Sequence, residues 1–238
     1  SIDEAPGGKY VNMDMTMHLA DYAGFEARRQ DARSRGRLRG IGMANVTEQT
    51  SNSFGETVEI RIDSTGAATV IPGSSSHGQG HDTMYKILVS DRLGLDETDI
   101  RVTQVDTDVA PNGYGTYASR TAALGGGATA IAADRIIAKA KRIAAHLVEA
   151  DAGDMELDGG DFRVAGTDRV VTMKEVALAA YRPSMLADDI ETGLHENATF
   201  APEIPNFPNG CHICEVEIDP ETGTTEVLRY AVVDDVGT

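Results

Sequence analysis

The chain has 238 residues, 41% of them hydrophobic, which suits one large globular domain or two smaller ones. Its net charge of −17 disfavours nucleic acid and anionic membrane surfaces as partners, because both are themselves negatively charged. No apolar run approaches the roughly 20 residues of a transmembrane helix, and the N-terminal residues lack the pattern of a signal peptide.

The first predicted elements are a helix and three strands. Residues 14–35 have the spacing of a charged surface helix that ends near Gly36. A strand rich in small residues is expected over 38–49. Residues 57–62 and 68–71 alternate apolar and polar side chains on either side of a turn, which predicts a β-hairpin.

Helices dominate the middle of the chain. We expect helices over 79–93 and 119–150, separated by a short strand over 99–105. A tight turn at 158–161 predicts another hairpin. The next helix, over 172–181, begins with the residues of an N-terminal capping box.

Prolines make residues 183–209 the loosest part of the chain, where we expect a connection or an extended strand. A last hairpin is predicted from 215–218 and 226–230, which flank a turn with proline and glycine at 219–223. Strands and helices alternate irregularly along the whole sequence. This order predicts an α+β fold with mixed sheets, hairpins and packed helices, and not a doubly wound parallel sheet.

The first candidate binding segment is glycine-rich and runs from Gly73 to Thr83, between a predicted strand and a predicted helix. Glycines let the backbone approach a ligand closely, and a helix start offers unpaired N–H groups that suit an anion such as phosphate. Gln79 and His81 can add side-chain hydrogen bonds. The alternative interpretation is an ordinary polar loop with a glycine-rich helix cap.

The second candidate segment combines Asp106-Thr107-Asp108 with residues 113–121, which are dense in hydroxyl groups. Together with Arg120, its single cation, these hydroxyls can hold phosphate or pyrophosphate. Glycines 125–127 would cost a helix roughly 1 kcal/mol each relative to alanine, so they predict another helix or a cofactor packed on the backbone. The alternative is a flexible loop that continues to residue 127.

Two groups of metal-ligand residue types are interpreted as ordinary structure. Cys211 and Cys214 flank a histidine, but a strand turns them to opposite faces and no second pair completes a tetrahedral site. His77 and His81 are separated by glycines and lack an obvious third ligand. We therefore predict no metal ion bound by protein side chains. Two cysteines alone favour a reducing, cytoplasmic location.

The ordered set of motifs resembles the molybdopterin-binding region of the molybdenum hydroxylases, the family of xanthine dehydrogenase, aldehyde oxidase and carbon monoxide dehydrogenase. The motifs are Gly78-Gln79-Gly80-His81, then Asp106-Thr107-Asp108 (with Val105 in place of the usual glycine), then Gly115-Thr116-Tyr117-Ala118-Ser119-Arg120, and finally the last hairpin with the strand over 233–237. The resemblance covers nearly the whole chain. Each motif is weak by itself, but their order and spacing are specific.

The resemblance predicts that residues 1–238 form a partial molybdopterin-binding domain, truncated at both ends relative to the catalytic subunit of the family. Sub-domains are expected at about 38–150 and 151–238. The family's general-base glutamate is expected beyond Thr238. We therefore name no catalytic residue and expect the isolated chain to be inactive.

By resemblance, the two glycine-rich loops bind a molybdopterin dinucleotide that carries molybdenum. The residues expected to contact it are Gln79, Gly80 and His81 near the pterin or phosphates, and Thr116, Tyr117, Ser119, Arg120 and Thr121 near the pyrophosphate and nucleotide. In the family, this cofactor supports hydroxylation of a C–H or aldehyde carbon with oxygen from water. Electrons then leave through iron–sulfur clusters and usually FAD, which implies iron–sulfur and flavin subunits or domains as partners, besides a small-molecule substrate.

Two other functions are compatible with the same loops. One is a non-catalytic binding or assembly module whose phosphate-binding loops dock a partner. The other is a phosphate- or nucleotide-binding protein unrelated to molybdenum. The three hypotheses differ in the ligand that they require, because only the first needs a pterin dinucleotide.

Overall fold

The computed structural model of the chain describes residues 11–51, 54–104, 106–110 and 112–235. It divides into two compact units, a smaller one made of Ser1–Thr50 with Asn206–Thr238 and a larger one made of Ser51–Pro205. This division differs from the expected boundary near residue 150. The reason is that strand β8 (Leu194–Phe200) pairs with β2 (Glu56–Ile62), which unites distant parts of the sequence in one sheet.

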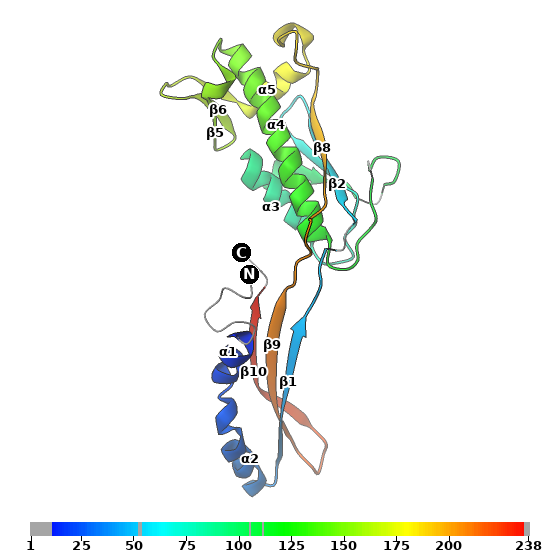
Figure 1. Ribbon diagram of the computed structural model, residues 1–238, viewed down its shortest axis with the longest axis vertical. Coiled ribbons are helices and arrows are strands. Elements are labelled where there is room, and N and C mark those ends of the chain that lie inside the picture. Colours follow the sequence, from blue (N-terminus) through cyan, green and yellow to red (C-terminus); the bar gives the residue numbers. More distant parts are fainter. Residues whose placement is uncertain (1–10, 52–53, 105, 111, 236–238) are drawn as a thin grey trace. The chain divides into compact units, whose positions relative to one another are not determined.

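The smaller unit is a three-stranded antiparallel sheet with two helices along one face (Figure 1). Its elements are α1 (Val11–Leu19), α2 (Phe25–Ser34), β1 (Leu38–Thr47), β9 (Asn209–Ile218) and β10 (Thr225–Asp235), with strand order β1-β9-β10. The hairpin of β9 and β10 confirms the hairpin predicted at this place. Alternate residues of β9 point to the helices, where Cys211 and Ile213 are buried with Ala20.

The helix predicted over 14–35 is interrupted in the structure. Asp21 has a φ of 46°, in the left-handed region, and a short 3₁₀ turn follows it before α2 begins. Arg28 stabilises this corner, because its Nη2 donates a hydrogen bond of 3.0 Å to the backbone oxygen of Asp21. The helical spacing of the sequence continues across the corner, so periodicity alone could not locate the break.

A buried carboxylate ties the helices of the smaller unit to its sheet. Glu215 on β9 is 1% exposed, and it forms ion pairs with Arg28 of α2 at 2.9 Å and with Arg39 of β1 at 2.6 Å. Burial opposes ionisation of Glu215, but the hydrogen bonds and charges of the two arginines outweigh it and lower its pKa. The pair of cations therefore holds Glu215 in its charged form.

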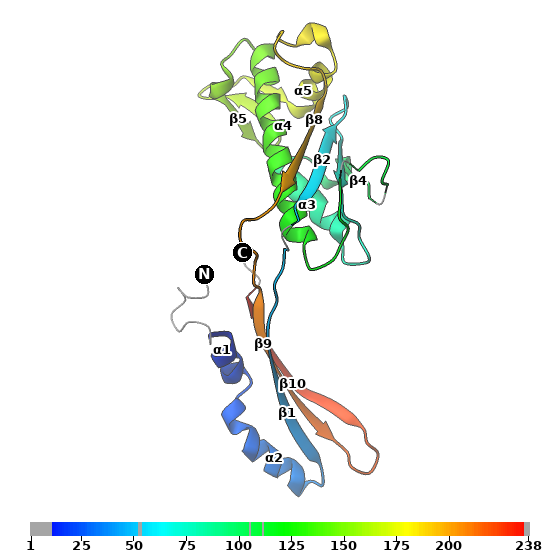
Figure 2. The same cartoon turned by 45° about the vertical axis from the view of Figure 1, so that its right-hand side comes forward.

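The larger unit has a mixed sheet with strand order β4-β3-β2-β8 and two long helices packed against it (Figure 2). Besides β2 and β8, this layer contains β3 (Ala68–Pro72) and β4 (Ile100–Val102), and its helices are α3 (His81–Leu93) and α4 (Gly126–Leu147). Among the described strands of this sheet, β3 and β4 alone pair in parallel, so the sheet confirms the predicted α+β class. Val70 of the sheet and Ala132 of α4 are both fully buried in the core between the layers.

The three consecutive glycines permit close packing at the start of α4. A π-helical turn over Thr121–Gly125 precedes the α-helix, so the alternative of a flexible loop up to residue 127 is wrong. A Cβ on Gly126 would lie 3.4 Å from Leu88 of α3, and one on Gly127 would clash with the ring of Phe200 of β8. Protein, and not a cofactor, thus covers these glycines.

A small antiparallel sheet and a short helix complete the larger unit. These are β5 (Met155–Asp158), β6 (Asp161–Val164), β7 (Val170–Thr172) and α5 (Met173–Ala180). The predicted capping box is present, because Glu175 N donates to Thr172 Oγ1 at 3.2 Å and Thr172 N donates to Glu175 Oε2 at 2.8 Å. These hydrogen bonds lower the pKa of Glu175.

Replacement of Thr172 by alanine should therefore destabilise α5 by about 1 kcal/mol, because one N-terminal N–H group loses its acceptor. Amide hydrogen exchange of residues 173–180 would measure the loss. Thr172→Ser keeps the hydroxyl and should retain most of the protection. Equal amide exchange in the wild type, Thr172→Ala and Thr172→Ser would contradict a stabilising role of the cap.

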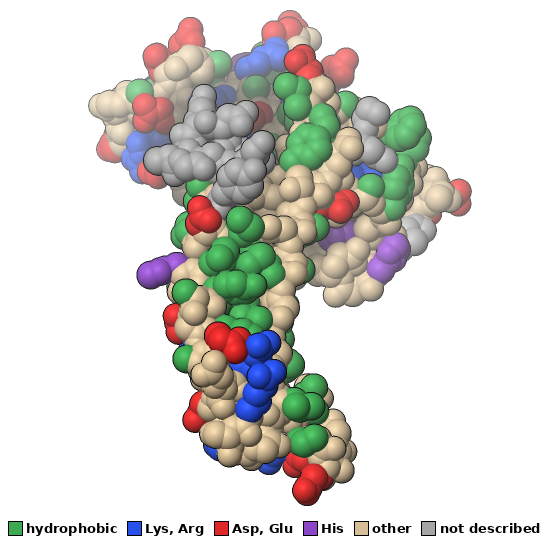
Figure 3. Space-filling model, turned by 60° about the horizontal axis from the view of Figure 1, so that its bottom comes forward, with side chains coloured by type: hydrophobic (Ala, Val, Ile, Leu, Met, Phe, Trp, Pro, Cys, Tyr) green, Lys and Arg blue, Asp and Glu red, His purple; other side chains and the backbone are tan. Residues whose placement is uncertain are grey.

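The proline-rich segment over 183–209 contains strand β8, in line with the expected extended strand. Within the described residues, no helix has the length and apolarity needed to cross a bilayer. Acidic side chains are dispersed over the face shown in Figure 3, as their spread along the sequence indicates.

Candidate functional site

The first glycine-rich loop lies between the end of β3 and the start of α3. Gly80 has a φ of 77° and directly precedes the first residue of the helix, His81. His81 is only 9% exposed, and its Nδ1 has no hydrogen-bond partner among the described residues. Gln79 is exposed, and its Oε1 accepts a hydrogen bond from the backbone N–H of His77. The loop therefore places one exposed amide side chain and one buried imidazole at a helix N-terminus.

The second loop touches the first through a pair of hydrogen bonds. Ser75 N donates to Thr116 Oγ1 at 3.0 Å, and the same hydroxyl donates to the backbone oxygen of Ser75 at 2.6 Å. The backbones also approach closely, since a Cβ on Gly73 would lie 2.5 Å from the Cα of Gly113. Two segments that are distant in the sequence are thus held side by side.

The helical segments that follow the two loops, α3 and the π-helical turn that leads into α4, contact each other. The hydroxyl of Tyr85 on α3 lies against Gly125, just before α4, and it bonds to Ser74 Oγ of the first loop at 3.1 Å. Burial raises the pKa of Tyr85 to about 12, so its hydroxyl stays protonated at neutral pH. Two helix N-termini, which attract anions, therefore flank the paired loops.

The exposure of the eight predicted contact residues separates them into groups. Gln79, Gly80, Tyr117 and Ser119 are exposed, Thr116 is half-buried, and His81, Arg120 and Thr121 are buried. The first five can meet a ligand as they stand. Ser119 lies in a tight turn, because it and Ala118 both have a φ of 50°, which is unusual for residues other than glycine.

Arg120 does not have the environment that the sequence analysis expected. It is fully buried, and its Nη1 forms an ion pair with the equally buried carboxylate of Glu56. Its Nη2 donates to the backbone oxygens of Phe54 at 3.1 Å and Gly55 at 2.8 Å. The charge of Arg120 is thus paired below the surface. The partner was not recognised in the sequence, because Glu56 lies at the start of β2 and resembles an ordinary strand residue.

Sequence reasoning also missed a residue that shapes the first loop. Gln104 follows β4, and its Oε1 accepts a hydrogen bond of 2.5 Å from Ser76 N. The sequence analysis placed it within the predicted strand over 99–105, and its position just before the Asp106-Thr107-Asp108 motif was the signal that could have found it. This contact links the first loop to the segment that leads into the second.

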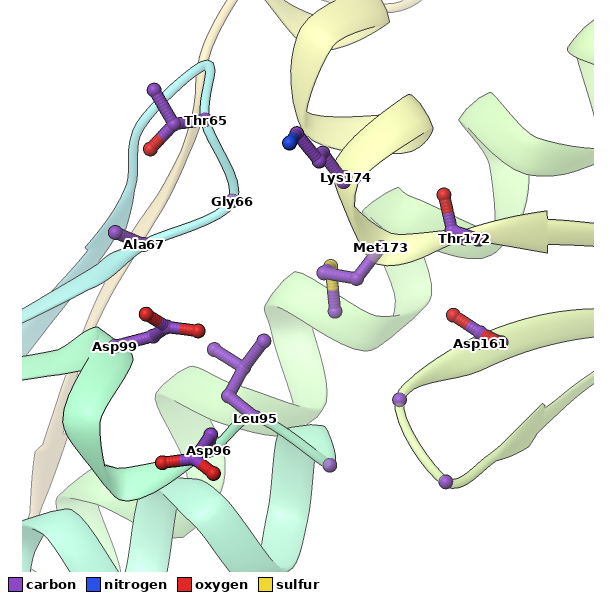
Figure 4. Close-up of a pocket in the computed structure, with 13 residues that line it drawn as sticks. Thr65, Gly66, Ala67, Leu95, Asp96, Asp99, Asp161, Thr172, Met173 and Lys174 are labelled. Atoms are coloured by element: carbon purple, nitrogen blue, oxygen red, sulfur yellow. The ribbon is translucent and has the colours of Figure 1, made fainter.

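A pocket of about 400 Å³ elsewhere in the larger unit contains none of the predicted residues (Figure 4). Three carboxylates, from Asp96, Asp99 and Asp161, and the amine of Lys174 line it. Asp96 already caps a short helix by accepting from Thr98 N at 2.8 Å. Among the described residues, no three His, Cys, Asp or Glu side chains are grouped closely enough to hold a metal ion.

Comparison with known proteins identifies the class. Residues 15–238 match the family of the molybdopterin cofactor-binding domain, and the chain belongs to this family. It is similar to the carbon monoxide dehydrogenase large chain of Afipia carboxidovorans, with 38% identity over 99% of this chain and 31% of the relative. Subunit gamma of the 6-hydroxypseudooxynicotine dehydrogenase complex of Paenarthrobacter nicotinovorans is 32% identical over 97% of this chain and 29% of its own length.

Solved structures agree with these relatives. Reconstituted carbon monoxide dehydrogenase from Oligotropha carboxidovorans superposes with a TM-score of 0.85 at 36% identity, over 98% of this chain and 31% of the other. Quinoline 2-oxidoreductase from Pseudomonas putida 86 also gives 0.85, at 30% identity over 97% of this chain and 31% of the other. The resemblance noted in the sequence is confirmed. The chain spans about three tenths of the length of these relatives.

Proposed function

We propose that the two paired loops form part of the cradle for a molybdopterin dinucleotide. The observation that carries this proposal is the reciprocal hydrogen bonding of Ser75 with Thr116, because it brings both glycine-rich loops to one place beside two helix N-termini. A pyrophosphate-bearing ligand is anionic, and helix N-termini favour anions through their free N–H groups and dipole.

The residues present fit such a group. His81 is buried, so it would meet the cofactor only where the bound group reaches below the surface of the first loop, through its unpartnered Nδ1. Such a contact would be favourable, since a buried polar group without a hydrogen bond costs free energy. Gln79, Tyr117 and Ser119 are exposed and supply an amide and two hydroxyls, while Thr116 shapes the junction. When bound, the cofactor would supply the redox chemistry of its molybdenum, and the residues of this chain would bind and orient it.

The names of the relatives support a role in binding the cofactor and not the substrate. Carbon monoxide, quinoline and 6-hydroxypseudooxynicotine differ in size and chemistry, yet each relative matches nearly the whole of this chain. A segment that is common to enzymes with such different named substrates is expected to bind a component that those enzymes have in common, and the cofactor is such a component. The interpretation as a non-catalytic assembly module has no support among these relatives.

For the full-length protein, we propose an oxidoreductase subunit that hydroxylates a C–H or aldehyde carbon with oxygen from water. Its partners would be iron–sulfur and flavin subunits or domains, and a small-molecule substrate. A reducing, cytoplasmic location is part of this proposal, and it agrees with the two free cysteines, Cys211 and Cys214.

His81 offers the sharpest test of the cradle. His81→Leu in the full-length subunit removes the unpartnered nitrogen and should leave stability unchanged or slightly higher, because an unsatisfied buried polar atom disappears. Retention of cofactor on gel filtration should fall by about tenfold, which corresponds to one lost hydrogen bond of about 1.4 kcal/mol. Molybdenum analysis and pterin fluorescence of the purified subunit measure this loss.

His146→Leu is the matched control, because His146 is exposed in the last turn of α4, at the opposite end of that helix from the loops. It should leave the cofactor content at the wild-type level. If the two variants retained equal molybdenum and pterin, His81 would not face the cofactor and the assignment of the first loop would be wrong.

A further inference from the structure

We propose that Glu56 and Arg120 are a positioning pair, whose ion pair holds the 112–121 loop in the shape that meets the cofactor while Arg120 itself stays out of contact with it. This inference rests on the proposed function of the two loops. It assigns a role to Glu56, which the sequence analysis did not single out, and it changes the role of Arg120 from ligand contact to support.

The guanidinium of Arg120 joins two segments of the larger unit. Nη1 donates to the backbone oxygen of Gly115 at 2.9 Å and pairs with Glu56, while Nη2 donates to two backbone oxygens in 54–55 at 3.1 and 2.8 Å. The rings of Tyr114 and Tyr117 lie 5.7 and 5.4 Å from the guanidinium and cover it. One side chain thus fastens both ends of the turn between Gly115 and Arg120 to the start of β2.

That turn needs support from outside. Ala118 and Ser119 both have a φ of 50°, and such backbone conformations persist only where surrounding contacts hold them. Three other contacts reach the turn: the bonds of Thr116 with Ser75, the bond from Arg120 N to Tyr117 O at 3.3 Å, and the bond from Ser51 N to Ala118 O at 3.4 Å. The side-chain bonds of Arg120 to Gly115, 54–55 and Glu56 add a restraint that connects the turn carrying Tyr117 and Ser119 to the start of β2.

Glu56 lies where the two loops meet. It pairs with Arg120 of the second loop, and a Cβ on Gly73 of the first loop would lie 2.5 Å from its Oε1. Burial raises the pKa of Glu56 by more than the charge and hydrogen bonding of Arg120 lower it. The ionised pair carries no net charge, so in that form it supports the loops without placing a net charge beneath an anionic ligand.

Positioning and direct contact predict opposite results for Glu56→Gln in the full-length subunit. If the pair positions the loop, this variant leaves Arg120 without its counter-charge, and the loop shifts. A misplacement of about 1 Å in a binding group can cost about 100-fold in function, so we expect at least a tenfold loss of bound molybdenum and pterin per folded subunit. If Arg120 contacted a phosphate directly, Glu56→Gln would free its charge and the cofactor content would stay at or above the wild-type level.

Arg120→Lys gives a second, independent comparison. Lysine keeps the positive charge but lacks the planar fork that reaches Gly115, 54–55 and Glu56 together, so the positioning role predicts a loss as large as that of Arg120→Ala. A direct phosphate contact predicts that lysine retains most of the cofactor. Substantial retention in Arg120→Lys, with loss in Arg120→Ala, would overturn the inference.

Glu215→Gln is the matched control, because Glu215 is also a buried carboxylate paired with arginines, but in the smaller unit. It should lower stability without lowering the cofactor content of the folded protein, which separates positioning from loss of stability in general. Hydrogen exchange of residues 112–121 should rise in Glu56→Gln and not in Glu215→Gln. Hydrogen exchange tests the role of the pair whether or not cofactor is bound. Absence of cofactor from the wild-type subunit would overturn the proposed function and leave the positioning role to be judged by hydrogen exchange.

Discussion

Replacement of Gly73 by alanine should separate the two loops and destabilise the larger unit by about 3 kcal/mol, because the new methyl group has no space. A Cβ there would lie 2.5 Å from the Cα of Gly113 and 2.5 Å from Oε1 of Glu56. Backbone atoms cannot rotate away as a flexible side chain can, so the loops themselves must move. The temperature of thermal unfolding and the cofactor content of the full-length subunit should both fall.

Gly42→Ala is the control for this substitution. Gly42 is exposed on β1, and a Cβ there meets nothing within 4 Å, so alanine should change stability by less than about 0.5 kcal/mol. Wild-type stability together with wild-type cofactor content in Gly73→Ala would show that the loops are not packed backbone against backbone. Loss of cofactor with unchanged stability would show that the close approach serves binding alone.

Replacement of Glu215 by alanine should destabilise the smaller unit by about 3–5 kcal/mol, because it leaves two cations without their shared partner. Arg28 and Arg39 have side chains that are 19% and 14% exposed, so water can relieve part of this cost and the lower end of that range is expected. Hydrogen exchange of the β9 amides would measure the effect. Asp134→Ala removes an exposed partner of Arg92 and should cost less than about 1 kcal/mol.

The contribution of Glu215 to the stability of the smaller unit should depend on pH. Because the folded pKa lies below the unfolded value of about 4.3, the ionised carboxylate contributes its full stabilisation above that value. The contribution disappears as the pH falls through the lower folded pKa. Wild-type and Glu215→Ala proteins should therefore differ most near pH 7 and converge in acid, and a constant difference down to pH 2 would contradict the role of the charge.

Much of the fold could be predicted because its signals are local. Alternation on either side of a turn located the two long hairpins, and the capping residues Thr172 and Glu175 located the start of α5. Hairpin and cap signals depend on neighbours within a few residues, which a sequence displays directly. The adjacency of the two loops was expected on a different ground, since Gln79 and Thr116 each belong to a motif whose order in the chain resembles one family.

The structure decided the points that depend on distant partners. Arg120 stands among hydroxyls in the sequence and suggested a phosphate ligand, but in the structure Glu56 and the backbone oxygens of Gly115 and 54–55 bind its two terminal nitrogens. The glycines at 125–127 left open whether a helix or a cofactor covers them, and α3 and β8 do so.

By itself, the sequence determined the α+β class, the hairpins and the family, because periodicity and turn chemistry are properties of short stretches of chain and the order of motifs is visible directly along it. Tertiary structure alone decided that β8 unites with β2, that Asp21 breaks the first helix, and that the charge of Arg120 is neutralised beneath the loop. The physical reason is that burial and counter-charge are set by whatever folds against a residue. Those neighbours come from parts of the chain that no local pattern connects.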